Sequence, residues 1–587
     1  MKRFILILVA LGFASAALAQ PYTWPNDWTV AEPGEATSGG TLQTYAIGEI
    51  RTFNPIISAE STSVTDLMWN GTMSGARLII QPPTSDEFIP YAAESFEVSE
   101  DGLTVDVTLR DGILWSDGTP VTVQDYFLTY TLETDEAVGS NGFDSWFIDG
   151  DPITLEVVGE NGLRFTFPAV DRTALPVVAM LPTPNHILGE IYGEGGDAEA
   201  IKAAWGTDVD LSTTVWTTPW VPVSFRPGER LILERNPTYG DWNVDEQGNA
   251  LPYLDGVNFA ILEDIDSALN LYIAGELDIF NPASLDQIGV IAQANQNGDI
   301  DATILENVSP VDSSQFIVFN HNLSSNEFKQ DLFRTAEFRQ AMSHLVDREA
   351  MVELVYGGAA SPMYSNVYQV LDFWVNNDIP RFDYDPEEAT RLLTNLGFSD
   401  RDGNGVLEDA EGNELSFNLV TNAGNDQREQ LIQIFADSAR EVGVDVQTQP
   451  IEFSLMVDQL LATGEDRPFE AILIGLTGGS RIWPFGSNVV PCGGNLHMYN
   501  TSGECLYPQE QLMERLYFQG RQTLDTDAAK EIGDQIQAVQ AEFQPIIYTV
   551  SPAQHYSWSN AVRGEHPADF ISSILGSRQL ALTFKAQ

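Results

Sequence analysis

Strand-like apolar runs alternate with helical patterns through residues 335–543, and this alternation restricts the fold more than any other feature of the sequence. The helical patterns cover 335–356, 385–396, 426–442, 454–463 and 509–543. The strand-like runs between them cover 415–420, 444–450 and 470–476. Strands that alternate with helices of this length predict β-α units, whose ligands bind in crevices beyond the strand ends.

The N-terminal half has a different pattern of short β-prone segments. A strand is expected at 39–45, a turn at 53–55 and a helix at 61–74. Asp101-Gly102 and Asp111-Gly112 lie between alternating segments, which is typical of hairpins. Thr122 is placed to cap a helix that begins near Val123. The sequence therefore predicts an α/β chain, and a length of 587 residues indicates two or three domains.

The first 19 residues have the features of a secretory signal. Lys2 and Arg3 precede an apolar run at 4–13, and small residues at 17–19 predict cleavage after Ala19. This run is about half the ~20 residues that a membrane-spanning helix needs. No Cys follows the cleavage site, so a lipid anchor is not expected, and residues 20–37 are predicted to be a flexible leader. We expect an exported protein, periplasmic or extracellular, that is soluble and monomeric.

The chain is strongly acidic. Without Lys2 and Arg3, 26 basic residues face 85 acidic ones, which gives a net charge of −59. Such a charge repels phosphate backbones and anionic lipid headgroups, so nucleic acid is not an expected partner. The favoured alternative is that the acidity is an adaptation for solubility or salt and says nothing about a ligand.

Motifs of several enzyme classes are missing. No lysine follows a glycine as in a P-loop, no two histidines have zinc-protease spacing, and G-x-S-x-G is absent. A pair of carboxylates could still form a glycosidase dyad, because 85 acidic residues allow many pairings. We predict no enzymatic activity and no cofactor for chemistry, with a secreted hydrolase as a less favoured alternative.

Two further features predict structural elements. Cys492 and Cys505 are the only cysteines, and a close pair in an exported chain favours a disulfide over a metal site. Residues 400–411 match D-x-[DN]-x-[DN]-G-x5-E, a calcium-loop pattern. The expected ligands are Asp400, Asp402, Asn404, the Val406 carbonyl and Glu411. The alternative is a turn without an ion.

One long stretch, "IPYAAESFEVSEDGLTVDVTLRDGILWSDGTPVTVQDYFLTY", resembles a signature of the family 5 solute-binding proteins of ABC importers, which include oligopeptide-, dipeptide- and nickel-binding proteins. "TPWVPVSFRPGERLILERNPTYGDW", "VFNHN", "FRQAMSHLVDREAMVELVYGGAASP" and "YDPEEATRLL" follow in the family's order. The resemblance implies a class II, large cluster C type of two-lobed periplasmic-binding-protein fold with an extra N-terminal subdomain.

The resemblance also implies how the chain is divided. The first lobe would comprise 38–70, 213–305 and 546–587, with the extra subdomain at 71–212 and the second lobe at 306–545. Chain crossings near 308–319 and 547–552 would form the hinge. A solute that touches both lobes would then favour the closed state, which a permease could recognise.

The solute class stays open at this point. Peptide-binding relatives hold the ligand's α-amino group with an Asp after the strand that corresponds to "AILIGL", but Gly478 and Gly479 stand there. This absence weakens a peptide ligand, because a buried ammonium without a counter-charge costs several kcal/mol. The family resemblance still implies an oligopeptide or similar small solute, with an oligosaccharide as a close alternative.

Aromatic faces suit sugar rings, and polar side chains near the predicted hinge suit peptide or hydroxyl groups, although each such residue can equally serve the core, a turn or a salt bridge. The predicted ligand-binding residues are Asn54, Trp69, Trp146, Trp216, Trp220, Asn320, Asn322, Gly478, Gly479, Arg481 and Trp483, with Trp374 as a further aromatic candidate.

Overall fold

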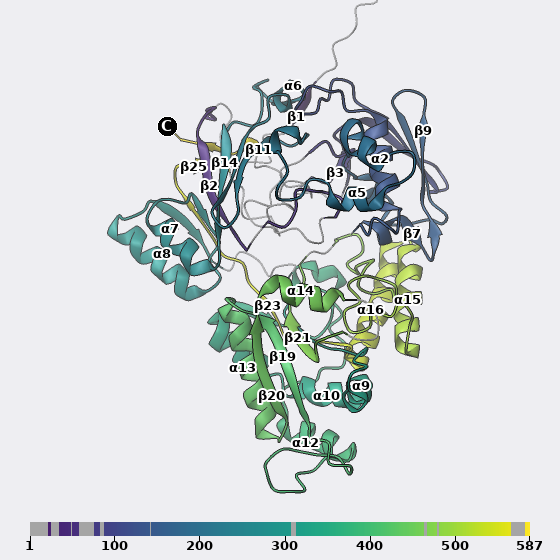
Figure 1. Ribbon diagram of the computed structural model, residues 1–587, viewed down its shortest axis with the longest axis vertical. Helices are drawn as coiled ribbons and strands as arrows, with labels where there is room; N and C mark the ends of the chain where they lie inside the picture. Colours follow the sequence, from purple (N-terminus) through teal and green to yellow (C-terminus); the bar gives the residue numbers. More distant parts are fainter. Residues whose placement is uncertain are drawn as a thin grey trace, which may run out of the picture.

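Two lobes, each built on its own mixed sheet, make up the fold (Figure 1). The computed structural model describes residues 21–24, 35–48, 50–57, 75–82, 87–140, 142–306, 313–462, 467–477, 480–564 and 581–586. In Figure 1 the first lobe lies above, in purple to teal, and the second lies below, largely in green. The alternating helices and strands confirm the predicted α/β class.

The first lobe contains two main sheets. The larger consists, in spatial order, of β11 (Trp220–Arg226), β12 (Arg230–Arg235), β14 (Gly256–Leu262) and β2 (Thr41–Ile47). The smaller consists of β15 (Ile279–Phe280), β24 (Tyr556–Ser559) and β16 (Ala302–Leu305), and packs with α7 (Ile265–Ile273) and α8 (Leu285–Asn297). Because β24 comes from the end of the chain, the first lobe is discontinuous in sequence.

An antiparallel subdomain packs on the first lobe. Its sheet consists of β5 (Ala93–Val98), β6 (Thr104–Leu109), β10 (Gly162–Thr166) and β9 (Thr154–Val158), next to α2 (Val123–Glu133). The hairpin predicted at Asp101-Gly102 joins β5 to β6, where Gly102 has a φ of +70°. Thr122 caps α2 as predicted, in a capping box with Asp125. One apolar cluster runs through subdomain and first lobe, so they share a core.

The second lobe has a five-stranded sheet with helices on both faces. Its strands are β20 (Asp445–Ile451), β19 (Ser416–Asn422), β21 (Ala471–Ile474), β17 (Phe316–Phe319) and β22 (Ile546–Tyr548). Ile317 and Phe319 pack on one face, whereas Phe316 and Val318 pack on the other. This two-sided burial explains why β17 and β21 are apolar throughout.

Helices of the second lobe lie close to the predicted ranges. They include α12 (Pro386–Asn395), α13 (Asp426–Glu441) and α14 (Phe453–Leu461). The predicted helix 509–543 is two helices, α15 (Pro508–Arg521) and α16 (Thr526–Phe543), since Asp525 caps a new helix. The predicted helix 335–356 is divided into α10 (Ala336–His344), α11 (Arg348–Ala350) and η6 (Met351–Val355). The helix expected at 61–74 lies outside the described residues.

The chain crosses between the lobes over shorter segments than predicted. One crossing lies between β16 and β17 and includes residues 307–312, which are not described. The other lies between β23 (Val550–Pro552) and β24. The strands β22 and β23 pair with β17 and β18 (Ala360–Pro362), so they belong to the second lobe and not, as predicted, to the first lobe or the hinge. The buried side chains of β22 anchor it in the five-stranded sheet.

Among the described residues, no helix combines the length and the apolarity that crossing a membrane requires.

Candidate functional site

Two adjoining cavities lie where the lobes meet. The first, the hinge cavity, has a volume of about 240 Å³ and is lined by Asn281, Pro282, Ala283, Ser313, Gln315, Tyr356, Asn425, Gln427, Arg428, Thr477, Pro552, Ala553, Gln554, His555 and Tyr556. The second, the loop cavity, has a volume of about 360 Å³ and is lined by Ser314, Asn366, Tyr368, Leu476, Thr477, Ser480, Trp483, Pro484, Phe485, Gly486, Asn488, Val489, Val490, Leu496 and Tyr548. Thr477 lines both cavities.

The position of these cavities follows from the sheet of the second lobe. The parallel strands β19 and β21 end at Asn422 and Ile474, and the residues that follow them line the cavities. Residues 281–283 of the first lobe and 553–555 of the chain crossing complete the hinge cavity. The cavities therefore lie at the carboxyl ends of the strands, as predicted for a ligand site of β-α units.

Among the described residues that line either cavity, Arg428 is the only charged one other than a titratable histidine. It lies in the first turn of α13, which is capped by Asn425. Its Nε donates to Gln315 Oε1 at 2.9 Å, and its Nη1 donates to Asn422 Oδ1 at 2.8 Å. Both partners are neutral, and burial lowers the pKa of Arg428 to about 10. The guanidinium therefore keeps its charge at neutral pH.

A close approach of two strands brings Arg428 to the cavity. A Cβ atom at Gly475 would lie 2.3 Å from the Ser314 carbonyl oxygen and 3.0 Å from Arg428 Nη2. Only glycine fits at this point without moving the backbone of the neighbouring segment. Gly475 therefore holds the end of β21 against the start of β17.

Three polar atoms beside the cavities are buried without a hydrogen-bond partner. They are Asn281 Oδ1 in the hinge cavity, and Asn366 Oδ1 and Trp483 Nε1 in the loop cavity. Buried polar atoms in folded proteins nearly always have a partner, which can be water or a ligand. One donor and two acceptors are thus available to a bound molecule, from both lobes.

No carboxylate lines either cavity among the described residues, although the chain contains 85 acidic residues. The cavities therefore offer amides, hydroxyl groups, aromatic faces and one guanidinium. A ligand with hydroxyl groups or a negative charge can be satisfied here, whereas an ammonium group would lack a counter-charge.

The lobes also touch across a second contact, formed by the subdomain and α15. In Figure 1, β7 (Phe147–Ile148) lies directly above α15. Arg521 of α15 donates through Nη2 to Asp171 Oδ2 at 2.6 Å, and through Nη1 to the Phe147 carbonyl at 3.0 Å. The side chains of Arg521 and Asp171 are 2% and 0% exposed, so this ion pair is buried between the lobes.

Arg172 extends this contact toward the loop cavity. Its backbone N–H donates to the Arg521 carbonyl at 2.9 Å, and its Nη1 donates to the Thr523 carbonyl at 3.1 Å. Its guanidinium carbon lies 5.1 Å from the ring centre of Trp374 and 5.7 Å from that of Trp483. Because Trp483 lines the loop cavity, the contact of Asp171, Arg172 and Arg521, here called the latch, adjoins the candidate site.

Sequence comparison identifies the family. A family model described as bacterial extracellular solute-binding proteins, family 5 middle region, matches residues 87–487. The chain belongs to this family. A probable ABC transporter-binding protein of Deinococcus radiodurans is 37% identical over 100% of both chains.

Solved structures resemble this solute-binding protein over nearly its whole length. The oligopeptide-binding protein AppA of Bacillus subtilis, in complex with a nonapeptide, has a TM-score of 0.76 at 22% identity and covers 94% of this chain and 100% of its own. The periplasmic binding protein MelB of Agrobacterium fabrum, in complex with stachyose, has a TM-score of 0.82 at 20% identity and covers 96% of this chain and 87% of its own. These likenesses confirm the two-lobed fold, and their ligands do not decide the solute class.

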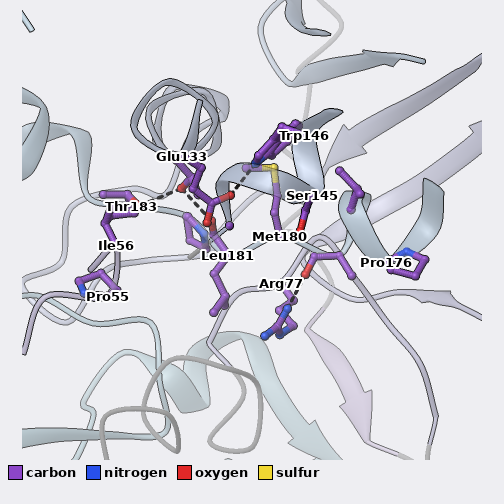
Figure 2. A pocket seen from close by; sticks show the side chains of 15 residues that line it. Pro55, Ile56, Arg77, Glu133, Ser145, Trp146, Pro176, Met180, Leu181 and Thr183 are labelled. Carbon is purple, nitrogen blue, oxygen red and sulfur yellow. Dashed lines mark hydrogen bonds between the residues drawn. The ribbon is translucent and has the colours of Figure 1, made fainter. Parts of the chain in front are cut away.

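Three predicted aromatic residues lie in the core of the solute-binding protein. Trp216 Nε1 donates to Thr214 Oγ1 at 2.7 Å, and Trp220 Nε1 donates to the Leu254 carbonyl at 3.2 Å. Trp146 lies beside a cavity of the subdomain (Figure 2), where it donates to Glu133 at 2.7 Å. Burial raises the pKa of the Glu133 carboxyl group. Since all three indoles are buried and paired within the protein, the structure does not bring them to the interlobe cavities.

The predicted asparagines secure turns. Asn54 Nδ2 donates to the Ile201 carbonyl at 2.7 Å, and Asn320 Nδ2 donates to the Phe469 carbonyl at 2.8 Å. Asn322 Oδ1 accepts from the Thr501 backbone at 2.8 Å. Since β17 runs antiparallel to β21, Asn320 and Asn322 leave the sheet at the edge opposite the cavities. This topology corrects the prediction that they face a ligand.

Of the remaining predictions, Trp483 lines the loop cavity. Trp374 Nε1 donates to the Arg481 carbonyl at 2.8 Å, so these two residues support the loop that carries Trp483. Trp69, Gly478 and Gly479 lie outside the described residues. Sequence reasoning missed Asn281, Gln315, Asn366 and Arg428, although the position of Arg428 just beyond a strand and a cap was a usable signal.

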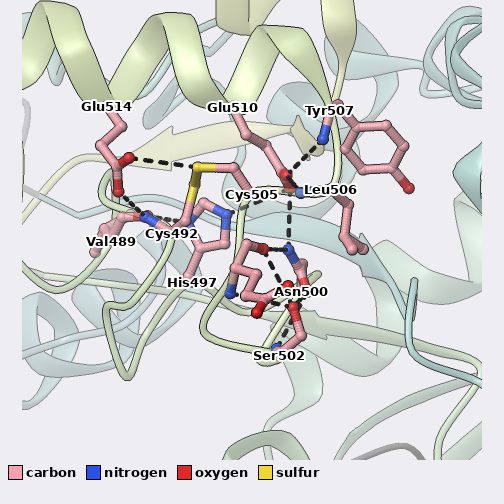
Figure 3. The surroundings of a disulfide bond; sticks show 11 residues. Val489, Cys492, His497, Asn500, Ser502, Cys505, Leu506, Tyr507, Glu510 and Glu514 are labelled. Carbon is pink, nitrogen blue, oxygen red and sulfur yellow. Dashed lines mark hydrogen bonds and ion pairs between the residues drawn. A yellow bond between two sulfur atoms is a disulfide. The ribbon is translucent and has the colours of Figure 1, made fainter.

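A disulfide joins Cys492 to Cys505 as predicted (Figure 3). It closes a loop that supplies Leu496 to the loop cavity, next to Val489 and Val490. Glu514 of α15 accepts a hydrogen bond from the Cys492 backbone at 3.0 Å. The disulfide closes this loop, and the hydrogen bond to Glu514 attaches it to α15, the helix that carries the latch residue Arg521.

Replacing both cysteines with serine should lower the free energy of unfolding of the second lobe by about 3 kcal/mol, because the bridge spans 13 positions and restricts the unfolded chain. Thermal unfolding with and without dithiothreitol measures this effect. The reductant should lower the melting temperature of the wild type and leave the double variant unchanged. An unchanged wild type would contradict the expected stabilisation.

Proposed function

We propose that this protein is the solute receptor of an ABC importer, which captures a small solute between its lobes and delivers it to the permease subunits. The observation that carries the proposal is the hinge cavity at the lobe junction, which both lobes and the chain crossing line, and which adjoins the loop cavity of the second lobe. Family membership supports the same function. A glycosidase would need two carboxylates beside its substrate, and none lines these cavities among the described residues, so a hydrolase is disfavoured.

The chemistry of the lining favours an oligosaccharide or a similar hydroxyl-rich solute. Unpaired amide oxygens of Asn281 and Asn366 can accept from hydroxyl groups, and the Trp483 N–H can donate to them. Arg428 can donate to hydroxyl or carboxylate oxygens. An oligopeptide remains the second candidate, because the structurally similar AppA is described in complex with a nonapeptide.

Capture and release depend on closure of the two lobes. A solute that hydrogen-bonds Asn281 of the first lobe and Arg428 of the second binds the closed state better than the open one, and shifts the population toward it. A permease that recognises the closed shape thereby recognises a loaded receptor. The protein's own residues bind and orient the solute, and no cofactor takes part.

The proposed setting is outside the cytoplasmic membrane. The basic residues Lys2 and Arg3, the apolar run and the alanines up to Ala19 support export and cleavage after Ala19.

The solute that the protein carries from its own cell identifies the class directly. Mass spectrometry of the small molecules released by denaturing the purified protein should give a hydroxyl-rich compound without a primary amine. Release of peptides with free amino termini would overturn the assigned solute class and leave the receptor function intact. Copurification of no solute, together with no thermal shift by either class, would overturn the receptor function.

A further inference from the structure

The loop between α12 and β19 lies at the far end of the second lobe from the cavities (Figure 1). Its first part is a series of tight turns. Asp400 accepts hydrogen bonds from the backbone N–H groups of Gly403 and Gly405, at 2.7 and 3.2 Å. Asp402 accepts from the Asn404 N–H at 3.0 Å. Gly403 and Gly405 have φ angles of +80° and +90°, so glycine suits both positions. These bonds orient the two aspartates.

Glu408 brings a third carboxylate to the same place. Its backbone forms isolated bridges with Ser399 and Glu414, which turn the chain back beneath the loop. The residue is 6% exposed, and its Oε1 accepts from the Arg401 backbone N–H at 2.6 Å. Its Oε2 is buried and has no hydrogen-bond partner. A buried carboxylate oxygen without a partner is rare, and indicates a missing positive or hydrogen-donating group.

The three carboxylates converge. One oxygen from each of Asp400, Asp402 and Glu408 lies within 4.8 Å of the others. None of the ion pairs among the described residues involves these three side chains. The guanidinium of Arg401 is turned away and donates to the Gly397 carbonyl at 3.0 Å. Carboxylates at this separation repel each other. The three side chains therefore need a cation that the described residues do not supply.

We infer that Asp400, Asp402 and Glu408 bind a calcium ion that holds this loop. Hard oxygen ligands without nitrogen or sulfur suit Ca²⁺ better than a transition metal. Glu408 takes the place of the predicted ligand Glu411, because Glu411 lies in the next turn, where its N–H donates to Asp409 Oδ1 at 2.9 Å. Glu411 does not belong to the converging group.

The ion would fasten two elements of the second lobe. Leu407, next to Glu408, donates to the Gly443 carbonyl at 2.8 Å and accepts from the Leu415 N–H at 2.7 Å. The loop therefore joins the end of α13 to the start of β19, and its site lies away from the solute cavities. Calcium should stabilise the lobe without changing solute affinity.

Thermal unfolding in 5 mM Ca²⁺ or in EDTA, at equal ionic strength set by NaCl, tests this site. Calcium should raise the melting temperature by roughly 2–5 °C, as expected for a Kd of about 10⁻⁴ to 10⁻³ M in a lobe of this size. Glu408→Gln should abolish the shift, and Glu411→Gln should retain it as the matched control. Asp402→Asn, at an exposed position, should also abolish it without disturbing the fold.

Titration calorimetry with CaCl₂ gives the second readout. The wild type and Glu411→Gln should bind one ion, and Glu408→Gln should bind at least tenfold more weakly. Absence of calcium binding by the wild type, or unchanged binding by Glu408→Gln, would overturn the assignment. Loss of binding by Glu411→Gln alone would restore Glu411 as the ligand and also overturn it.

Discussion

Asp171→Asn should weaken solute binding about a hundredfold, although Asp171 touches neither cavity. In this structure, where the lobes are in contact, its carboxylate pairs with the buried Arg521 guanidinium. Removing one partner leaves the other charge buried and uncompensated, which costs about 3 kcal/mol. When the lobes separate, both groups return to water, so the cost falls on the closed state alone. The closed state should therefore be less populated. The free energy of solute binding should become less favourable by the same amount.

Titration calorimetry with the copurified solute measures the affinity, and small-angle X-ray scattering measures the radius of gyration. The variant should have the larger radius when no solute is bound. Asp106→Asn is the control, because its pair with Arg164 is exposed within the subdomain and contributes at most about 1 kcal/mol. An Asp171→Asn variant with wild-type affinity and radius would show that the latch does not stabilise closure.

Arg428→Met should lower solute affinity by roughly 10- to 100-fold, because hydrogen bonds to a charged group contribute about 1.5–3 kcal/mol. The substitution also leaves Gln315 Oε1 and Asn422 Oδ1 without their donor, so a lower melting temperature should accompany it. Arg428→Lys keeps the charge but loses the planar arrangement of donors, and should give an intermediate affinity.

Arg440→Gln is the matched control for this experiment. Arg440 lies on the same helix, α13, but its side chain is 63% exposed and pairs with Asp437 at the surface. Its replacement should leave solute binding unchanged. If Arg428→Met binds solute as tightly as Arg440→Gln does, Arg428 is a structural residue and not part of the binding site.

Much of the second lobe could be predicted from local sequence, because its elements carry local signals. The strand β21 is apolar on both faces, and α13 begins after a capping asparagine, Asn425. The break between α15 and α16 was missed because Asp525 restarts a helix without interrupting the apolar pattern. Local sequence patterns thus predict where a helix or strand lies more accurately than where it begins or ends.

The site was harder to predict, because its residues meet through long-range packing. Asn320 follows a strand as Arg428 does, yet only the direction of β17 in the sheet decides which of them faces the cavity. Trp216 and Trp220 are aromatic residues of the kind that stack on sugar rings, but their N–H groups donate hydrogen bonds within the core. Glu408 and Glu411 are both spaced to serve a calcium loop, and only the bridges to Ser399 and Glu414 select Glu408.

Among the residues that the structure describes, no carboxylate lines either cavity, and this makes the clearest test of the account. Titration calorimetry should compare neutral oligosaccharides, including stachyose and mannohexaose, with a nonapeptide that has a free amino terminus and with its N-acetylated form. We expect binding of at least one oligosaccharide, and we expect the acetylated peptide to bind no more weakly than the free peptide, because no counter-charge awaits the ammonium group. Tight binding of the free nonapeptide that acetylation abolishes, with no oligosaccharide bound, would contradict the account.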